Sequence, residues 1–413
     1  MISFDIIVIG GGPAGCAMAL DLNSRGYDVA LCDQAKFPRD KVCGEFISPG
    51  ADPILRQLGV LDAIEALSPK RLKGVAISSY GGAELSIDYP AETGLSPTSL
   101  SVPRYQLDAL FLKQVQNAGV KVFEQHKVTD FIFENGCVAG VRGWDETKTV
   151  FSMNGKMVVD AGGRNAVSPR KFSLKREPGS NSKIAFSAHW QGVSLPEDYC
   201  YMHVSRPGYT GISSVGNGQS NVVLVVEGSA LGGEKPETFY HRVLMQNSRR
   251  SNMLESGERI EPVRSVESLA FSVKPVPCGG LVLVGDATGF IDPFTGEGIY
   301  LSLRSSQLAG EAIHSGFQNS NFSRKFLSIY DERRKKEFGG KFLLSQILQT
   351  LIYNRFFCDQ VIKSLSGNRV LAQTLAGVIG DILPAEKAVS LKFLLQLLSG
   401  MFDGNGALRK IPR

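Results

Sequence analysis

Histidine and cysteine are scarce in this chain, and neither occurs in pairs. The five histidines are scattered without HxxxH or His/Cys spacing, so the sequence offers no set of paired metal ligands. The seven cysteines form no CxxC pair, and their odd number and wide spacing predict reduced thiols rather than a disulfide framework. We therefore expect no metal site and a cytoplasmic protein.

Long apolar runs and dense blocks of one charge are also missing. The first apolar run, residues 6–9, is far too short to cross a bilayer, and no signal-peptide pattern surrounds it. The net charge of +5 is a small excess among 45 basic and 40 acidic residues, which predicts no nucleic-acid partner. A hydrophobic fraction of 43% over 413 residues is enough for two or three packed units.

The first 33 residues have the pattern of a strand, a glycine turn, a helix and a second strand. The turn is Gly10-Gly11-Gly12-Pro13-Ala14-Gly15, and Asp33 follows the second strand. In such a GxGxxG turn the first glycine permits the bend, the second lets a pyrophosphate approach the backbone, and the third lets helix and strand pack closely. The phosphates bind at the helix N-terminus, and the later carboxylate accepts a hydrogen bond from a ribose hydroxyl. The segment therefore predicts a dinucleotide site.

A second motif occurs late in the chain. An apolar run over residues 281–284 leads into Gly285 and Asp286, and Pro293-Phe294-Thr295-Gly296-Glu297-Gly298 follows. A strand that ends in Gly-Asp can present a carboxylate to a polyol hydroxyl, and the following glycines leave room and N–H donors for a ring.

These two motifs, with the Phe37-Pro38-Arg39 loop between them, resemble the p-hydroxybenzoate-hydroxylase-type superfamily of FAD-dependent oxidoreductases. The superfamily contains aromatic hydroxylases, flavin halogenases and geranylgeranyl reductases, and the match in order and spacing extends over residues 1–335. The resemblance implies that Asp286 holds the ribityl chain of FAD, that residues 293–298 line the isoalloxazine ring, and that two arginines lie near the pyrophosphate. The predicted cofactor-binding residues are Gly10, Gly12, Pro13, Ala14, Gly15, Asp33, Arg39, Cys43, Gly44, Arg104, Gly285, Asp286, Pro293, Gly296 and Gly298.

Within the superfamily, the loop Arg39-Asp40-Lys41-Val42-Cys43-Gly44 most resembles the geranylgeranyl-reductase branch, which has a Cys-Gly pair at this point. The resemblance implies that Cys43 lies beside the flavin and the substrate; a buried cysteine with a packing role alone is the alternative. Glu45 and Tyr209 are candidates for proton transfer, with a solvated loop glutamate and a sheet-packing tyrosine as alternatives. Cys43, Glu45 and Tyr209 are thus the predicted catalytic residues.

Several departures from the superfamily leave the substrate and the reaction open. Residues 207–212 keep the tyrosine of the reductases' YxWxFP signature but have glycine in place of tryptophan. Trp144 and Trp190 lie far apart, so the WxWxIP segment of halogenases is missing. The middle Ala-Asp-Gly motif appears as residues 160–164 with glycine in place of the aspartate, which argues against a self-sufficient NADPH-using monooxygenase. No second GxGxxG occurs, so electrons are expected from transiently bound NAD(P)H or from a separate reductase.

We predict an α/β fold in which a discontinuous, Rossmann-like FAD-binding domain contains an inserted antiparallel β-sheet substrate domain and is followed by a helical region. The FAD-binding domain is assigned residues 1–75, 100–170 and 275–336, the β-rich domain residues 76–99 and 171–274, and the helical region residues 337–413. The C-terminal helices are expected to cover an apolar ligand or to contact a membrane surface.

The leading functional prediction is hydride transfer from reduced flavin to a C=C bond of an apolar, prenyl or polyketide-like small molecule. A nearby acid would supply the proton. The main alternative is a flavin-dependent monooxygenase acting on an aromatic or polyketide substrate in a dry pocket. A flavin halogenase and a non-catalytic prenyl-binding protein on the same fold are further alternatives.

Overall fold

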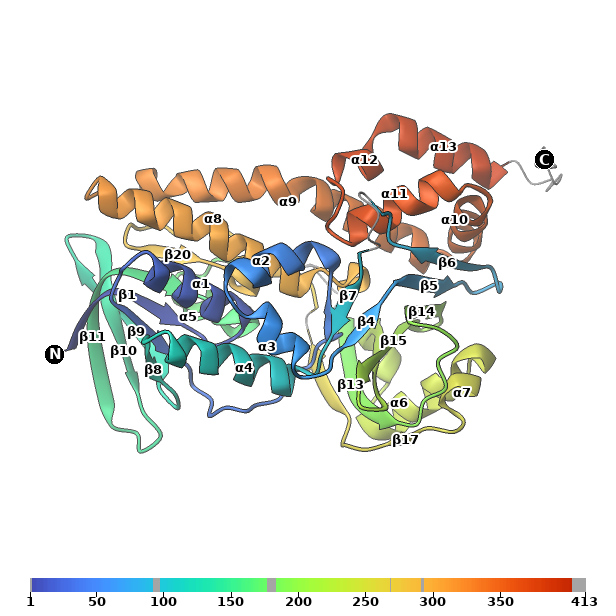
Figure 1. Ribbon diagram of the computed structural model, residues 1–413, viewed down its shortest axis with the longest axis horizontal. Helices are drawn as coiled ribbons and strands as arrows, with labels where there is room; N and C mark the ends of the chain where they lie inside the picture. The colour runs from blue at the N-terminus through green and yellow to red at the C-terminus, as the bar shows by residue number, and fades with distance from the viewer. Residues whose placement is uncertain (1, 92–96, 177–182, 268, 291–292, 403–413) are drawn as a thin grey trace.

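The computed structural model describes residues 2–91, 97–176, 183–267, 269–290 and 293–402 (Figure 1). These residues form two large sheets with helices packed on them, and a group of C-terminal helices at the upper right of Figure 1. The predicted α/β class, with antiparallel sheets and helices at the C-terminal end, is confirmed.

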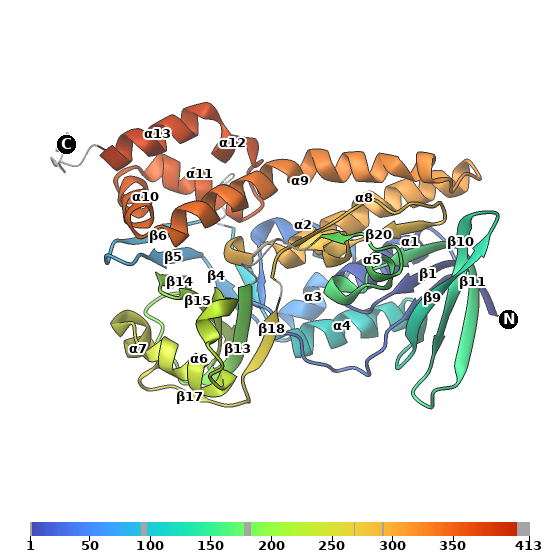
Figure 2. The same ribbon diagram turned by 180° about the vertical axis from the view of Figure 1, so that it is seen from behind.

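The first large sheet has seven strands in the order β8-β2-β1-β11-β10-β9, and β20 pairs with the C-terminal part of β11. Five strands are parallel: β1 (Ile2–Ile9), β2 (Val29–Cys32), β8 (Lys121–Phe123), β11 (Val150–Asp160) and β20 (Leu281–Leu283). An antiparallel hairpin of β9 (Lys127–Glu134) and β10 (Cys137–Trp144) extends the sheet past β11 (Figure 2).

The register of the parallel strands brings the predicted motifs to one edge of this sheet. Ile9 is aligned with Cys32 and with Asp160, and Asp160 is aligned with Leu283. The residues that follow these four positions therefore meet at the carboxyl edge, although more than 200 residues separate the first from the last. Ligands of open parallel sheets bind at this edge.

Helices cover one face of the first sheet. They are α1 (Pro13–Ser24), α4 (Arg104–Asn117) and α8 (Gly298–Gln318), and their apolar side chains form one core with Ile6 and Val8. The alternate residues Ile7 and Ile9 point to the opposite face, where the β9–β10 hairpin and α5 (Val167–Lys171) contribute to a separate core. Both faces are thus buried, as expected of strands with continuous apolar runs.

The second large sheet has eight strands in the order β17-β13-β16-β15-β14-β5-β6, with β18 also paired to β13. Every pairing is antiparallel except that of β14 with β5. The strands are β5 (Gly74–Ser78), β6 (Glu84–Asp88), β13 (Lys183–Gln191), β14 (Tyr199–Ser205), β15 (Gly208–Gly216), β16 (Gln219–Glu227), β17 (Glu258–Arg259) and β18 (Arg264–Glu267).

The two faces of this second sheet have different partners, as the period of two in the strands predicts. In β13, Phe186 and Trp190 face a core that contains α6 (Pro236–Met245) and α7 (Ser248–Leu254). In β15, Tyr209 faces the opposite way, into a core shared with the C-terminal helices.

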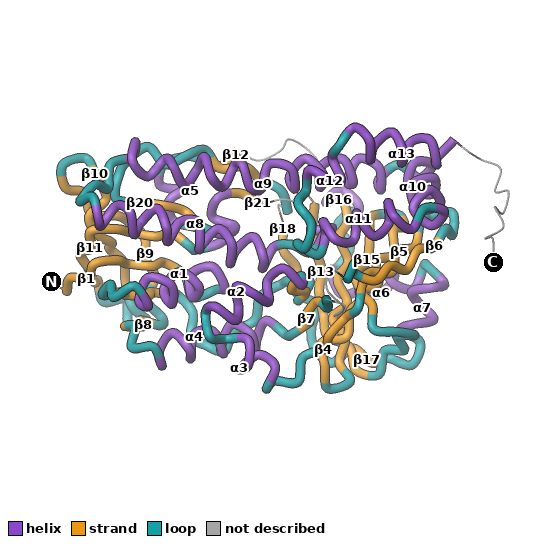
Figure 3. The backbone as a smooth tube through the Cα atoms, turned by 45° about the horizontal axis from the view of Figure 1, so that its top comes forward, coloured by secondary structure: helices purple, strands orange, loops and turns teal. Residues whose placement is uncertain are grey.

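Five helices end the described chain: α9 (Arg324–Tyr353), α10 (Arg355–Gly367), α11 (Arg369–Ile379), α12 (Glu386–Val389) and α13 (Leu391–Phe402). α9 runs beside α8 along the molecule (Figure 3) and continues without a break through position 337. The next helices begin at asparagines: Asn354 and Asn368 each accept a backbone hydrogen bond at 3.2 Å from the residue three positions on. No helix in the described ranges is long and apolar enough to cross a membrane.

Short elements complete the fold. One three-stranded sheet, β3-β7-β4, consists of β3 (Phe46–Ile47), β7 (Ser99–Ser101) and β4 (Lys70–Leu72) and lies between the two large sheets. Another, β12-β19-β21, consists of β12 (Lys175–Arg176), β19 (Phe271–Val273) and β21 (Gly289–Phe290). Two short helices, α2 (Asp52–Gln57) and α3 (Leu61–Glu65), follow β3.

Candidate functional site

A cavity of about 650 Å³ lies between the carboxyl edge of the first sheet and strands β13, β16 and β18 of the second. Cofactor sites typically have volumes of roughly 300–1,000 Å³. Many of the predicted cofactor-binding residues line this cavity: Gly10, Gly12, Pro13, Asp33, Arg39, Cys43, Gly44, Arg104, Asp286, Gly296 and Gly298. Ala14, Gly15, Gly285 and Pro293 are not among its lining residues: Gly15 packs on Gly10, Gly285 packs on Ala14, and Pro293 begins a short 3₁₀ turn.

The glycines of the first motif are required by close contacts. Gly10 has φ +104°, and a Cβ there would lie 2.5 Å from the carbonyl oxygen of Ala161. A Cβ on Gly15 would lie 1.8 Å from the carbonyl oxygen of Gly10, so only glycine lets α1 start this close to β1. No side chain caps α1, and its first N–H groups are available to phosphate oxygens. The turn therefore fits the pyrophosphate of a dinucleotide.

Asp33 is fixed at the end of β2 by two backbone donors. The N–H of Gly11 donates to Oδ2 at 2.6 Å, and the N–H of Ala35 donates to Oδ1 at 2.7 Å. Each carboxylate oxygen keeps a further lone pair, and Asp33 lines the cavity. A ribose hydroxyl can therefore donate to it, as predicted for this position.

The late motif packs directly on the first one. Gly285 has φ +59°, and a Cβ there would lie 2.9 Å from Cβ of Ala14 in α1. The N–H of Gly285 donates to Oγ of Ser305 at 2.9 Å, which ties the turn to α8. Asp286 lines the cavity beside this turn. The two motifs thus pack into one unit, and their cavity-lining residues would hold the pyrophosphate and ribityl parts of FAD.

Two arginines and a buried aspartate lie next to the glycine turn. Arg104 donates to both oxygens of Asp108 at 2.7 Å, and Nη1 of Arg39 lies 2.9 Å from Oδ2 of the same carboxylate. Burial alone would lower the pKa of Arg104, but Asp108 and Cys43 outweigh that effect and raise it. The Arg39 guanidinium lies 3.7 Å from where a Cβ on Gly12 would be, so it can contact a phosphate at the helix N-terminus.

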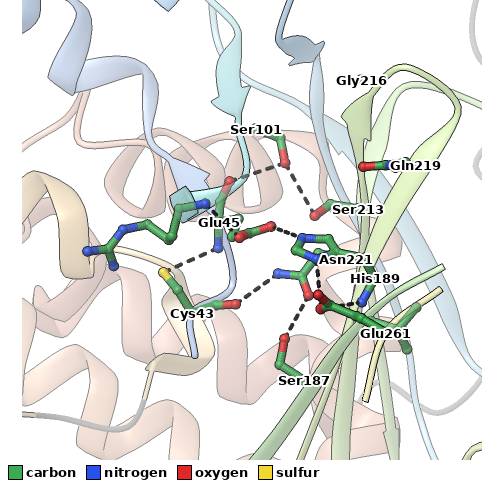
Figure 4. A network of polar contacts seen from close by, with 12 residues as sticks. Cys43, Glu45, Ser101, Ser187, His189, Ser213, Gly216, Gln219, Asn221 and Glu261 are labelled. Atoms are coloured by element: carbon green, nitrogen blue, oxygen red, sulfur yellow. Dashed lines mark hydrogen bonds and ion pairs between the residues drawn. The ribbon is translucent and has the colours of Figure 1, made fainter. Parts of the chain in front are cut away.

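The turn of Cys43, Gly44 and Glu45 also lines the cavity. Figure 4 shows Cys43 and Glu45 with their polar contacts. The N–H of Glu45 donates to Sγ of Cys43 at 3.3 Å, and Nδ2 of Asn221 donates to the Cys43 carbonyl at 2.8 Å. Glu45 has φ +56°, a left-handed conformation that non-glycine residues seldom adopt, and its N–H, its carbonyl and its side chain all have partners that hold it there. The side chains of Cys43 and Glu45 are therefore held in place at the cavity.

Glu45 also contacts a histidine from the second sheet. Its Oε1 accepts from the backbone N–H of Arg104 at 2.7 Å, and its Oε2 lies 2.7 Å from Nε2 of His189. Nδ1 of His189 lies 2.8 Å from Oε1 of Glu261 (Figure 4). Burial acts to lower the pKa of His189, but the two carboxylates outweigh it and raise this pKa above its ordinary value.

The structure separates the three predicted catalytic residues. Cys43 and Glu45 share the cavity wall, whereas Tyr209 does not line the cavity. Tyr209 is 3% exposed, and its ring makes an edge contact with Phe294 at a centroid distance of 5.1 Å. This placement corresponds to the sheet-packing alternative, and a catalytic role for Tyr209 stays a prediction.

His189, Glu261 and Asn221 are site residues that the sequence did not reveal. His189 is 144 positions from Glu45, so no local motif joins them. The alternation in β13 contains the relevant signal: Ala185, which lines the cavity, and His189 fall on one face of the strand, opposite Phe186 and Trp190. The alternation predicts His189 as a site residue only when it is known which face of β13 is turned towards the cavity.

Several apolar side chains line the cavity on the side of the second sheet. They are Phe46, Ala185, Val223, Val266 and Leu269, and Ser265 and Glu267 of β18 line it beside them. Polar and charged side chains such as Lys41, Glu45 and Arg164 line the same cavity, so groups that suit a dinucleotide and apolar groups share it.

Comparison with known proteins agrees with this geometry. A model of the family described as FAD binding domain matches residues 3–337. Conditioned medium factor receptor 1 of Dictyostelium discoideum is 26% identical, over 91% of this chain and 77% of its own length. A 1H-pyrrole-2-carbonyl peptidyl-carrier-protein chlorinase of Pseudomonas fluorescens is 25% identical, over 79% of each chain. Digeranylgeranylglycerophospholipid reductase 1 of Methanococcoides burtonii is 26% identical, over 88% of this chain and 86% of its own.

A solved structure shares the whole fold. The flavoprotein/dehydrogenase of Cytophaga hutchinsonii superposes with a TM-score of 0.81, covers 92% of both chains and is 22% identical. At this level of identity the likeness concerns the fold.

Proposed function

This chain belongs to the FAD-binding-domain family of flavoproteins, and we propose that it uses FAD to reduce C=C bonds of an apolar, prenyl or polyketide-like small molecule. Family membership confirms the resemblance to the FAD-dependent oxidoreductase superfamily. The family contains reductases and halogenases at similar identity to this chain, so the reaction is argued from the cavity itself.

The observation that carries the proposal is the position of Glu45. Glu45 lines the same cavity as the glycine turns and as the apolar side chains of Val223, Val266 and Leu269. Reduction of an alkene needs a hydride on one carbon and a proton on the other, and FAD in its reduced form supplies the hydride. Glu45, backed by His189 at 2.7 Å, is placed to give the proton.

The apolar side chains in the cavity lining support an apolar substrate. Val223, Val266 and Leu269 offer no hydrogen-bond groups from their side chains, so a ligand there gains from burial of its own apolar surface. Cys43 lies in the same wall, 3.3 Å from the Glu45 N–H, and we propose that its thiol contacts the substrate end of the flavin site. The relative from Methanococcoides burtonii is named as a reductase of a geranylgeranyl lipid, which supports this substrate class.

The electron donor and the membrane are proposed partners. Reducing equivalents come from transiently bound NAD(P)H or from a separate reductase, because the sequence has one GxGxxG turn. Helix α13 presents Leu391, Leu395 and Leu398 to solvent, exposed by 72%, 57% and 46%, on the face opposite buried Phe393 and Leu397. Such an exposed apolar face suits contact with the surface of a membrane that holds a lipid-like substrate.

Oxygen-dependent chemistry is the second candidate, because the chlorinase from Pseudomonas fluorescens is as similar as the reductase. It covers hydroxylation, the main alternative predicted from the sequence, and halogenation. Trp190 does not favour halogenation: it is buried on the far face of β13, and its Nε1 donates to the hydroxyl of Tyr240 at 3.1 Å.

The test is a product profile. The FAD-bound protein is reduced chemically under anaerobic conditions and mixed with a geranylgeranyl glycerolipid, menaquinone or a polyketide enone, and products are analysed by mass spectrometry. We expect at least one compound to gain two hydrogens, and the FAD-free protein to give none. No gain of hydrogen in any compound, together with hydroxylated or chlorinated products when oxygen and chloride are supplied, would contradict the proposal.

A further inference from the structure

A line of alternating acid and base side chains begins at Glu45 in the lining of the cavity. Figure 4 shows its first three members, Glu45, His189 and Glu261. The side chains of Glu45, His189 and Glu261 are 5%, 15% and 20% exposed. Beyond Glu261, Arg264 bonds its carboxylate at 2.7 Å and the exposed Asp40 at 3.0 Å. The exposed fraction of the side chains thus rises from Glu45 through His189 to Glu261.

Glu261 fixes the histidine ring. Its Oε1 accepts both the backbone N–H of His189 at 3.0 Å and the ring Nδ1 at 2.8 Å. Because a carboxylate oxygen only accepts, Nδ1 carries a proton, and Nε2 is left to face Glu45. Glu261 is itself held by Arg264, which with His189 outweighs the effect of burial and lowers the pKa of Glu261. The proton on Nε2 is therefore the mobile one.

We infer that His189 is the positioning residue that supplies the proton which Glu45 delivers into the cavity. This inference rests on the proposed function. In the step, the N–H bond at Nε2 breaks as an O–H bond forms on Glu45, and Glu45 gives one proton to the substrate carbon that does not receive the hydride. Reduced FAD is the reductant, so His189 and Glu45 transfer a proton and no electrons. Neutral His189 then regains its proton from water.

The charged groups around His189 favour its protonated form. Glu45 and Glu261 face the two ring nitrogens from the 43–45 turn and from the segment before β18. Arg264 contacts Glu261, and Arg259 donates to the Glu261 carbonyl at 3.0 Å, so both cations act through that residue. Arg104 bonds Glu45 through its backbone N–H while its guanidinium is held by Asp108. We therefore expect the ring to keep its charge to a higher pH than a free histidine and to lose it as pH rises further.

The first test follows the ring itself and needs no substrate. The FAD-bound protein is labelled with ¹⁵N-histidine and titrated by NMR, with His189 assigned among the five histidines by its loss in His189→Gln. We expect a midpoint above that of free histidine, which Glu45→Gln and Glu261→Gln each lower, and a mixed tautomer in Glu261→Gln. A midpoint that Glu45→Gln leaves unchanged would overturn the shared proton.

The second test follows the reaction of a geranylgeranyl glycerolipid with chemically reduced enzyme. His189→Gln is expected to lower the rate roughly 10²-fold and to abolish the decline in rate at high pH, while FAD affinity is unchanged. The matched control is His314→Gln, because His314 is not a cavity residue: its Nδ1 lies 2.7 Å from the hydroxyl of Tyr27. The pH profile of this variant should equal that of the wild type. A His189→Gln enzyme with the wild-type pH profile would refute proton supply by His189.

These two tests fail separately. A wild-type enzyme that reduces no compound refutes the proposed function, whatever the histidine titration shows. A His189 midpoint that does not respond to Glu45→Gln refutes the proton-sharing pair, even if the enzyme is active.

Discussion

Lys341 of α9 joins the C-terminal helices to residues 293–298 of the late motif, and replacing this lysine should destabilise the fold strongly. Its Nζ lies 2.9 Å from Oε1 of Glu297, contacts the carboxylate of Asp381, and donates to the carbonyl of Val378 at 3.2 Å. The side chains of Lys341, Glu297 and Asp381 are 7%, 7% and 0% exposed. Ser48, in the segment after β3, completes the cluster by donating to Asp381.

The substitution Lys341→Met leaves two carboxylates buried without their cation. Breaking a buried ion pair from one side costs about 3–5 kcal/mol, and we expect a loss in this range for the free energy of unfolding. The loss should be smaller at acidic pH, because burial raises the pKa of Asp381 to about 7 and a protonated carboxyl needs no cation. At higher pH Asp381 is charged, and the loss should approach the upper end.

The assay is urea unfolding followed by circular dichroism, with and without saturating FAD, because a bound ligand adds its own stabilisation. Lys336→Met is the control, since Lys336 lies on the same helix and is exposed. The triple variant Lys341→Met, Glu297→Gln, Asp381→Asn removes all three charges and should recover part of the loss. A loss below about 1 kcal/mol for Lys341→Met, the scale of a surface pair, would refute the reasoning.

Three further predictions concern stability, cofactor binding and membrane contact. Because the pKa of Asp381 is raised in the folded state from 3.8 to about 7, stability should fall as pH rises between these values. The melting temperature of Asp381→Asn should lack this part of the fall with pH. Equal slopes of melting temperature against pH for the variant and the wild type would contradict the prediction. Gly15→Ala should abolish FAD binding by flavin absorbance, because its Cβ would lie 1.8 Å from the Gly10 carbonyl oxygen, while Gly339→Ala, with open space around it, should bind normally. Leu391→Glu with Leu395→Glu should reduce co-sedimentation with phosphatidylglycerol vesicles several-fold without loss of FAD, and unchanged sedimentation would rule out α13 as the contact.

The parts of the site that depend on local geometry could be predicted from the sequence. The Gly10–Gly15 turn and the Gly285–Asp286 turn each follow an apolar strand. Their glycines indicate the positions at which another part of the backbone or a side chain comes too close for a Cβ atom. Register between parallel strands then brings the two turns together, which the fold class implies.

The parts that depend on contacts between distant elements could not be predicted. Glu45 meets His189 because a turn after β2 packs on one face of β13, and neither sequence segment indicates its partner. Tyr209 has the right period to face inwards, but the core it enters contains the C-terminal helices rather than the cavity. Lys341 interrupts the apolar pattern of its helix, and only the approach of Glu297 and Asp381 explains why it is buried.

The central claim, that this flavoprotein reduces an apolar alkene, is tested most directly by its need for oxygen. The FAD-bound protein is reduced under argon and mixed with the geranylgeranyl glycerolipid, and flavin absorbance and saturated product are quantified in the same vessel. We predict one reduced double bond for each flavin reoxidised, in the absence of oxygen. Flavin that stays reduced under argon and is reoxidised with product formation only when oxygen is admitted would contradict the claim.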